Sequence, residues 1–552
     1  MNEIRVTLRS DGEPEQELRV PSGTRLEELA ERFHATGVAM RVNNEILPLA
    51  ARLEVNARIE MVPLDSSEGV MIYRRSLAFL LAIAAWERFP ERNLQIGHSL
   101  GNSYYYTFAG DRKPAPEDIR ALEERMRHLA AENLPIEVHY LAYEEAVERF
   151  EKNRLTGTSL LLEQRSESLV QINVCKDFVD LYIEPLVNRT GILSTFNLLA
   201  YQDGFLLRFP GIGRGMEIER FEDSPRIFAV YNEYKKWGRI IGVHTVGHLN
   251  RHIANKTIRE FIRIAEAFQA RKLSELAEQI YEKRDAVKLI LLAGPSSSGK
   301  TTTAKRLSIE LKIMGLEPEA VSLDDYYVNV CHTPRDEKGE PDYECLEALD
   351  TAYLNEQLRA LLNGEEVILP SYDFKAGRRR EEGRKLRMGR RTMLIVEGIH
   401  GLNDALTPSI GRELKFKIYL SALTQLNLDD HNRIPTSDNR LLRRLVRDYQ
   451  FRGSDAVNTI KMWPSVQRGE RRHIFPFQNS ADAAFNSALD YELAVLKPYA
   501  VPLLRAIKPN RAEYAEAARL LAFLKNFAPI PAPYVPSQSI VREFIGGSEF
   551  SY

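Results

Sequence analysis

The sequence contains little cysteine and has no excess of charge of either sign. Its 552 residues include only three cysteines, Cys175, Cys331 and Cys345, which are too few and too widely spaced for a disulfide framework or a CxxC metal site. This usage is typical of a reducing compartment, so we expect a cytoplasmic protein. The 75 Lys and Arg residues nearly balance the 77 Asp and Glu residues, which leaves a net charge of −2. Composition alone therefore gives no electrostatic case for binding nucleic acid or an anionic membrane.

Long apolar runs are also missing. The longest hydrophobic run, residues 77–86, is much shorter than the roughly 20 residues that a membrane-spanning helix needs. The N-terminal residues lack the apolar core of a signal peptide, and we expect no membrane association. Hydrophobic residues (44%) and aromatic residues (9%) occur at the levels of ordinary globular proteins, and the length predicts roughly three or four domains.

A complete phosphate-binding loop follows a strongly apolar segment. Residues 294–301 read Gly-Pro-Ser-Ser-Ser-Gly-Lys-Thr, which matches GxxxxGK[ST], between a predicted strand at 287–293 and a predicted helix at 302–311. The backbone amides of such a loop face the phosphates of a nucleotide at a helix N-terminus. The pattern predicts that Lys300 bridges the β- and γ-phosphates and that Thr301 binds Mg²⁺. The predicted ATP-binding residues are Gly294, Pro295, Ser296, Ser297, Ser298, Gly299, Lys300, Thr301 and Thr302.

Apolar strands alternate with helical stretches in the segment that contains this loop. The alternation predicts a parallel sheet covered by helices on both faces, which binds ligands at the carboxyl ends of its strands. Asp324 follows the predicted strand 320–323, and Glu397 follows the predicted strand 392–396. Asp324 is the candidate base that accepts a proton from an attacking hydroxyl, and its alternative is a turn or helix cap. Glu397 is expected to hold Mg²⁺, directly or through water.

A group of arginines lies further along the chain. Arg440, Arg443, Arg444 and Arg447 have helical spacing, so several guanidinium groups share one helix face. Guanidinium groups stabilise the charge that spreads over a transferring phosphoryl group, and we expect this helix to be a lid that closes over the site. A solvated basic helix face is the alternative.

Five ordered motifs in this half resemble the uridine kinase and phosphoribulokinase superfamily, with the uridine kinase branch as the nearest. They lie at residues 294–302, 322–327, 370–374, 396–399 and 440–455. The resemblance implies transfer of the γ-phosphate of ATP, with Mg²⁺, to the 5′-hydroxyl of a uridine- or cytidine-like nucleoside. It implies a catalytic set of Asp324, Lys300, Arg444, Arg447 and Arg452. It also implies that Tyr343, Glu344, Tyr372 and Arg444 bind the substrate.

The chain departs from that family around the acceptor. Glu344 stands where the family has a shorter Asp, Gly377 stands where it has a base-binding His, and Ser454 replaces an arginine. A site that relies on hydrogen bonds changes its specificity when one partner is lost. The extra polar segment 424–437 is expected to lie over the active site, where His431 or Arg433 would replace the lost contacts.

The N-terminal half resembles part of another family. Residues 1–64 resemble the TGS domain, a ubiquitin-like β-grasp module, on the phrase Val-Pro-Ser-Gly-Thr-Arg-Leu-Glu-Glu-Leu-Ala that starts at residue 20. Residues 65–225 resemble the α+β editing domain of threonyl-tRNA synthetase, in which an HxxxH pair and a CxxxH pair build the site. These pairs align here with Arg75, Phe79, Cys175 and Val179. Because only the cysteine remains, we expect a degenerate site and a domain kept for binding or architecture.

Two further segments complete the predicted organisation. Residues 226–286 are predicted to be a helical connector, and the HxxxHxxxH motif at 244–252 is not expected to bind metal because glycines interrupt its helix. A kinase-like domain at 287–530 is followed by a tail at 531–552. The prolines of the tail predict an extended linker, and residues 539–548 are expected to dock on the kinase or on a partner subunit.

The sequence thus predicts a multidomain α/β chain with a β-grasp domain, an editing-like domain, a helical connector and a C-terminal phosphate-loop kinase. Two alternatives to a nucleoside kinase stay open. One is a sugar kinase of the phosphoribulokinase type. The other is an RNA- or ribosome-associated factor with regulatory ATP binding, in which the N-terminal domains contact RNA or protein. A homo-oligomer is compatible with each of these.

Overall fold

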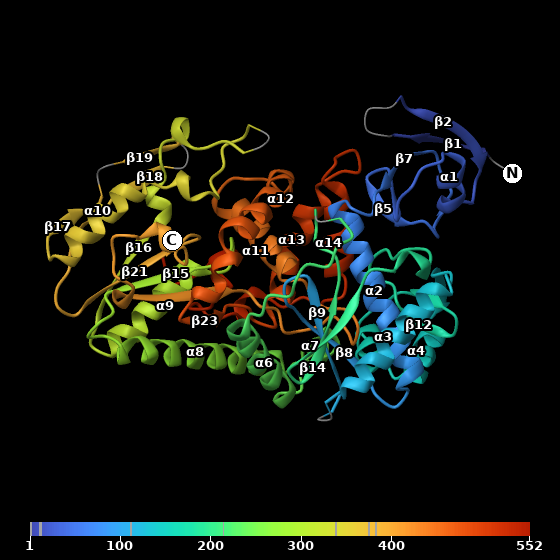
Figure 1. Ribbon diagram of the computed structural model, residues 1–552, viewed down its shortest axis with the longest axis horizontal. Helices are drawn as coiled ribbons and strands as arrows, with labels where there is room; N and C mark the ends of the chain where they lie inside the picture. The colour runs from blue at the N-terminus through green and yellow to red at the C-terminus, as the bar shows by residue number, and fades with distance from the viewer. Residues whose placement is uncertain are drawn as a thin grey trace.

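The computed structural model describes residues 3–9, 14–110, 113–213, 215–336, 339–373, 376–380 and 383–551. Figure 1 shows the β-grasp domain at one end of an elongated molecule and the kinase sheet at the other. In this view the editing-like domain lies below the β-grasp domain, and the last helices of the chain lie between these two domains and the kinase sheet. This arrangement confirms the predicted multidomain α/β class.

The β-grasp domain is a five-stranded mixed sheet with one short helix. The strand order is β2-β1-β7-β4-β5, in which β1 and β7 are parallel and the other neighbours are antiparallel. Alternate residues of β1 are buried, as expected for a sheet with one face on a core. Its elements are β1 (Glu3–Leu8), β2 (Gln16–Pro21), β3 (Thr24–Arg25), α1 (Leu26–Arg32), β4 (Ala39–Val42), β5 (Glu45–Pro48), β6 (Arg52–Leu53) and β7 (Ala57–Val62).

The editing-like domain is built around one long buried helix, α2 (Ser67–Arg88), with Ser66 as its N-cap. This helix is long and apolar enough to cross a membrane, but 78% of its apolar window is buried inside the protein, as in the core helix of a globular domain. Two sheets pack around it, in the orders β10-β11-β12 and β13-β14-β9-β8. The other elements are β8 (Leu94–Ser99), β9 (Ser103–Phe108), α3 (Pro116–Ala131), β10 (Glu137–Ala142), α4 (Tyr143–Lys152), α5 (Thr156–Leu162), β11 (Leu169–Cys175), β12 (Phe178–Leu181), β13 (Asn197–Tyr201) and β14 (Gly204–Arg208).

Three helices connect this domain to the kinase sheet: α6 (Pro225–Ile240), α7 (Val246–Ala254) and α8 (Ile258–Glu282). The histidine motif does not lie on one helix, because α7 begins after His244. The rings of His244 and His248 are 4.2 Å apart, and His252 is hydrogen-bonded to Thr257. Within the described ranges, no three His, Cys, Asp or Glu side chains are grouped so that they could hold a metal ion.

The kinase sheet has five parallel strands in the order β16-β21-β15-β22-β23. All five residues of the central strand β15 are buried, as expected for a strand with helices on both faces. The sheet confirms the predicted parallel topology. Its strands are β15 (Leu289–Ala293), β16 (Glu317–Ser322), β21 (Thr392–Gly398), β22 (Lys415–Ser421) and β23 (Ala483–Asn486). The associated helices are α9 (Lys300–Ile313), α10 (Thr351–Leu362), α11 (Thr436–Phe451), α12 (Ala456–His473), α13 (Glu492–Arg505), α14 (Tyr514–Leu524) and α15 (Arg542–Ile545). Two small hairpins pair β17 (Glu366–Ile368) with β20 (Lys385–Arg387), and β18 (Ser371–Asp373) with β19 (Arg378–Arg380).

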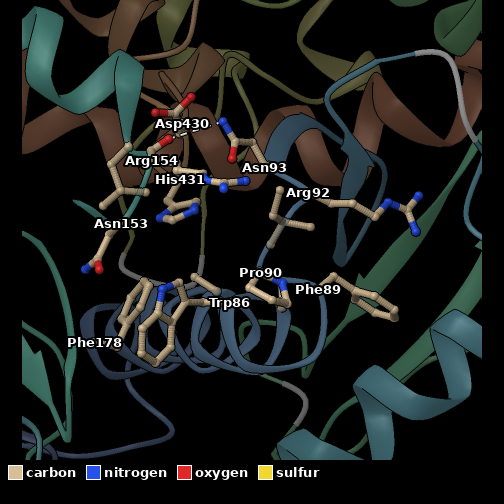
Figure 2. A pocket seen from close by; sticks show the side chains of 14 residues that line it. Trp86, Phe89, Pro90, Arg92, Asn93, Asn153, Arg154, Phe178, Asp430 and His431 are labelled. Atoms are coloured by element: carbon tan, nitrogen blue, oxygen red, sulfur yellow. Dashed lines mark hydrogen bonds between the residues drawn. The ribbon is translucent and has the colours of Figure 1, made fainter. Parts of the chain in front are cut away.

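The segment between β22 and α11 does not lie over the kinase site. It inserts into the editing-like domain, where His431 Nδ1 lies 2.9 Å from Asp180 Oδ2 and Asp430 accepts a hydrogen bond of 2.7 Å from the Gly157 amide. Figure 2 shows His431 beside the aromatic side chains of Trp86 and Phe178. The expectation that residues 424–437 cover the active site is therefore wrong.

Charge complementarity explains this docking. Burial disfavours a charged imidazole, but the carboxylate of Asp180 outweighs burial and raises the pKa of His431 to about 9. Arg433 stacks its guanidinium on the Tyr104 ring of the same domain, 5.2 Å from the ring centroid. Both residues expected to contact the substrate thus bind the editing-like domain instead.

Candidate active site

The phosphate loop lies between the end of β15 and the start of α9. Gly299 has φ +85°, a conformation that L side chains rarely adopt, and it turns the chain directly into the helix. The ammonium of Lys300 donates to the carbonyls of Gly294 (3.0 Å) and Pro295 (3.2 Å). The loop thus holds Lys300 over its own backbone, in a position to meet an incoming phosphate.

Two buried ion pairs brace this loop from α11. Arg440 and Glu470 form a bidentate pair, with 2.7 Å between Arg440 Nη2 and Glu470 Oε2, and Arg440 also donates to the Ser296 carbonyl. The Glu470 carboxylate in turn accepts from the Ser296 amide at 3.2 Å. Only 4% of the Arg440 side chain and 1% of the Glu470 side chain are exposed. The pair therefore supports the loop structurally.

The second pair joins Arg443 to Glu492, with 2.5 Å between Arg443 Nη2 and Glu492 Oε2. Arg443 also donates to the Ser297 carbonyl. This guanidinium is fully buried, and α11 belongs to the same hydrophobic core as the sheet. We expected α11 to be a closing lid, but it is a core helix.

The remaining arginines of this region surround one carboxylate. Arg444, Arg447 and Arg452 approach Asp448 at 3.1, 2.9 and 3.8 Å. Arg444 also donates to the Ser296 hydroxyl at 2.9 Å. Asp448 thereby gathers three positive charges beside the loop, as a site for phosphates requires.

Oxygen ligands suited to Mg²⁺ meet at the carboxyl ends of β15, β16 and β21. The Thr301 hydroxyl donates to Glu397 Oε1 at 3.2 Å, and the Ser322 hydroxyl donates to the same oxygen at 3.4 Å. Burial, together with the charge of Asp324, raises the pKa of Glu397 to about 7. A carboxylate that is costly to ionise alone is stabilised when a cation binds beside it. The residues present therefore fit a Mg²⁺ ion that is completed by nucleotide phosphates and water.

Asp324 follows β16 in a short 3₁₀ turn, Leu323–Tyr326, and its amide is capped by the Ser322 hydroxyl at 3.3 Å. Its side chain is exposed at the sheet edge. The negative charge of Asp324 acts on two other carboxylates, since it helps to raise the pKa of both Glu397 and Glu344. Asp324 thus lies between the metal side and the acceptor side of the site.

Glu344 is the residue predicted to bind the acceptor. One oxygen of its carboxylate is buried and has no hydrogen-bond partner in the part of the chain that the structure describes. Burial, with the nearby charge of Glu470, raises the pKa of Glu344 to about 7. A buried polar atom without a partner is uncommon, and an acceptor hydroxyl would satisfy it.

The other predicted substrate residues lie close to the same turn. Tyr343 contributes its carbonyl to the Tyr327 hydroxyl at 3.1 Å, and the rings of Tyr327 and Tyr372 are 5.8 Å apart. Tyr372 is held by its amide, which donates to Asp325. Phe374, the last residue of this motif, lies outside the described residues.

The structure explains why no histidine occupies position 377. Gly377 has φ +62°, and a Cβ atom there would lie 2.5 Å from Val330 Cγ2. A side chain at this position would therefore be strained, and it would fit only if Val330 moved.

Sequence reasoning missed His400, which is 1% exposed and follows β21. Burial lowers the pKa of His400 to about 4, so the ring is neutral, although the backbone of Cys345 and that of Glu344 lie close enough to oppose this shift. His473 lies 5.9 Å away, ring to ring. No motif marks His400, because only the fold brings it beside the segment that carries Glu344.

Comparison with known proteins agrees with this geometry. Residues 289–494 match the phosphoribulokinase / uridine kinase family. A solved structure described as a possible uridine kinase from Bacillus stearothermophilus is 22% identical and covers 39% of this chain and 98% of its own, with a TM-score of 0.27.

Curated relatives match the N-terminal region. The threonine–tRNA ligase of Acidithiobacillus ferrooxidans is 39% identical over 166 residues, which are 29% of this chain and 25% of the ligase. That of Methylococcus capsulatus is 33% identical over 164 residues, 29% of this chain and 26% of the ligase. The chain spans about a quarter of the length of these relatives. Together with the family match, they confirm both resemblances.

The residues that are predicted to align with the editing site of the synthetase make structural contacts. Arg75 is paired with Glu184, and Phe79 packs on Phe178 with 5.5 Å between ring centroids. Cys175 is buried, and burial raises the pKa of its thiol to about 11, so the thiolate is disfavoured. Arg75 and Phe79 thus each contact another residue of the same domain.

Proposed function

We propose that this protein is an ATP- and Mg²⁺-dependent kinase that phosphorylates a hydroxyl of a small molecule, namely the 5′-hydroxyl of a uridine- or cytidine-like nucleoside. The observation that carries the proposal is the convergence of the phosphate loop, Glu397 and Asp324 at one edge of the parallel sheet. The match of residues 289–494 to a kinase family supports it.

The donor half consists of the loop and the charges around it. The loop amides and Lys300 would bind the phosphates of ATP, and Thr301 and Glu397 would hold Mg²⁺. When bound, the ion would supply positive charge to the phosphate oxygens. Arg444, Arg447 and Arg452 are the candidates to stabilise the charge that develops on the γ-phosphoryl group.

In the acceptor half, Asp324 is the proposed base. Its carboxylate takes the proton of the acceptor hydroxyl as the hydroxyl oxygen forms a bond to the γ-phosphorus. The bond from that phosphorus to the β-bridging oxygen breaks, and ADP leaves. Glu344 and the tyrosines at 343 and 372 would orient the acceptor, and the unpartnered oxygen of Glu344 supports this role.

A panel assay tests the proposal. Purified full-length protein is incubated with γ-labelled ATP and uridine, cytidine, purine nucleosides or phosphorylated pentoses. We expect label in a pyrimidine nucleoside, and Asp324→Asn should reduce transfer by roughly 10²- to 10⁴-fold while ATP still binds. Asp203→Asn, which changes an exposed carboxylate on the far domain, is the matched control.

Label in a phosphorylated pentose alone would favour the phosphoribulokinase type. Transfer to none of the acceptors, by a protein that binds ATP, would refute the kinase proposal for these substrates. Full activity of the Asp324→Asn protein would refute the assignment of the base.

A further inference from the structure

The last residues of the chain return to the kinase and become part of its core. Ile540, Val541 and Phe544 are fully buried, and α15 packs against α11. The Phe544 ring lies 4.9 Å from the guanidinium carbon of Arg443, the residue that braces the phosphate loop. The Ser539 hydroxyl lies 3.2 Å from that of Tyr491. The predicted docking of residues 539–548 on the kinase is confirmed.

One side chain of this tail reaches the phosphate loop itself. The Glu543 carboxylate accepts hydrogen bonds from the Thr302 amide at 3.2 Å and from the Thr302 hydroxyl at 2.5 Å. Ile540 packs closely against the loop next to this contact, because a Cβ atom on Gly299 would lie 2.6 Å from Ile540 Cγ2. Thr302 is in the first turn of α9, where backbone amides have no partner within the helix and attract anions.

A nucleotide needs that same amide, since the loop and the first turn of its helix cradle the α- and β-phosphates. A carboxylate and a phosphate cannot accept from one N–H group in the same place, and their negative charges repel. We propose that Glu543 belongs to the nucleotide site and lowers its affinity, because it occupies a phosphate position on Thr302 that bound ATP must take over. This inference rests on the proposed function only in that a nucleotide binds to the loop.

The tail itself need not leave. Phe544 and Ile540 are anchored in the core, whereas Glu543 is only partly buried and can rotate away from Thr302.

The test compares full-length variants by calorimetric titration with a non-hydrolysable ATP analogue in the presence of Mg²⁺. Glu543→Gln keeps the shape of the side chain and removes its charge, and we expect roughly ten-fold tighter binding than in the natural protein. Glu543→Ala should shift affinity in the same direction. Glu549→Gln, which removes an exposed charge of the same tail, is the matched control and should leave affinity unchanged.

Equal or weaker nucleotide binding by both Glu543 variants would overturn the inference, because Glu543 would then not compete with the nucleotide. This readout is independent of the acceptor. A protein that binds the analogue but phosphorylates nothing contradicts the proposed function alone, whereas unchanged affinity in active variants contradicts the inference alone.

Discussion

Replacing Glu470 with glutamine would remove the negative partner of Arg440 behind the phosphate loop. Both side chains are almost completely buried, and the Glu470 carboxylate also holds the Ser296 amide. Removing one partner of a buried ion pair leaves the other charge without compensation, which costs about 3 to 5 kcal/mol. Because glutamine keeps one acceptor oxygen, we expect Glu470→Gln to lower the free energy of unfolding of the kinase domain by about 3 kcal/mol.

The structure supplies its own reporter for this experiment. The Arg440 guanidinium carbon lies 5.3 Å from the centroid of the Trp463 ring. In a background with Trp86→Phe and Trp237→Phe, urea unfolding followed by fluorescence reports on the surroundings of the pair. ATP affinity should also fall by about ten-fold, because Arg440, without its partner, would no longer be held against the Ser296 carbonyl of the loop.

Two controls make the result specific. Glu275→Gln breaks the pairs of one surface carboxylate with Arg271 and Lys272 on α8, and should cost less than about 1 kcal/mol. The double change Arg440→Met and Glu470→Leu removes both charges and should regain most of the lost stability, but not the support of the loop. A cost in Glu470→Gln no larger than that in Glu275→Gln, with unchanged ATP affinity, would refute the reasoning.

Three further predictions concern other sites. The pKa of Glu397 is raised in the folded protein, so this group contributes stability below about pH 4.5, and that contribution is lost as the pH rises through about 7. Binding of Mg²⁺, in contrast, needs the ionised carboxylate. Mg²⁺-dependent ATP binding should therefore strengthen between about pH 6 and 8, and an equally steep rise in Glu397→Gln would contradict this. His431→Leu leaves Asp180 buried without its partner, so unfolding should become easier by about 3 kcal/mol in thermal or urea denaturation, and no change would exclude a structural role for the pair. Gly377→His should destabilise the protein by roughly 2 kcal/mol and give no gain in uridine use, because a side chain there meets Val330; improved uridine phosphorylation would show that the backbone adapts.

Local sequence signals were sufficient for the kinase core. The phosphate loop, the carboxylates after β16 and β21, and the apolar strands between helices each depend on neighbours within a few residues, and the fold class follows from them. The sequence also showed that Gly377 departs from the family. The structural reason, a left-handed backbone conformation close to Val330, could be seen only in the structure.

Long-range partners could not be read in this way. The arginines of α11 suggested a lid, because nothing in their own segment shows that Glu470 and Glu492 bury two of them. His431 and Asp180 are in contact although they are 251 positions apart in the sequence, and Glu543 and Thr302 are in contact although they are 241 positions apart. In each case the deciding interaction joins charged or polar residues that carry no periodicity, so spacing alone could not reveal it.

The insertion between β22 and α11 bears on how far the chain could be shortened without disturbing the proposed active site. A fragment beginning near residue 287 would contain every residue of the proposed active site. It would also leave the insertion without Gly157 and Asp180, and expose two carboxylates, Asp429 and Asp430, that the full chain buries. The helix that braces the phosphate loop starts directly after this insertion, so such a fragment would begin that helix from an unanchored end. We therefore expect the editing-like domain to hold the start of α11 in place, so that separating the two halves of the chain would impair the proposed phosphoryl transfer.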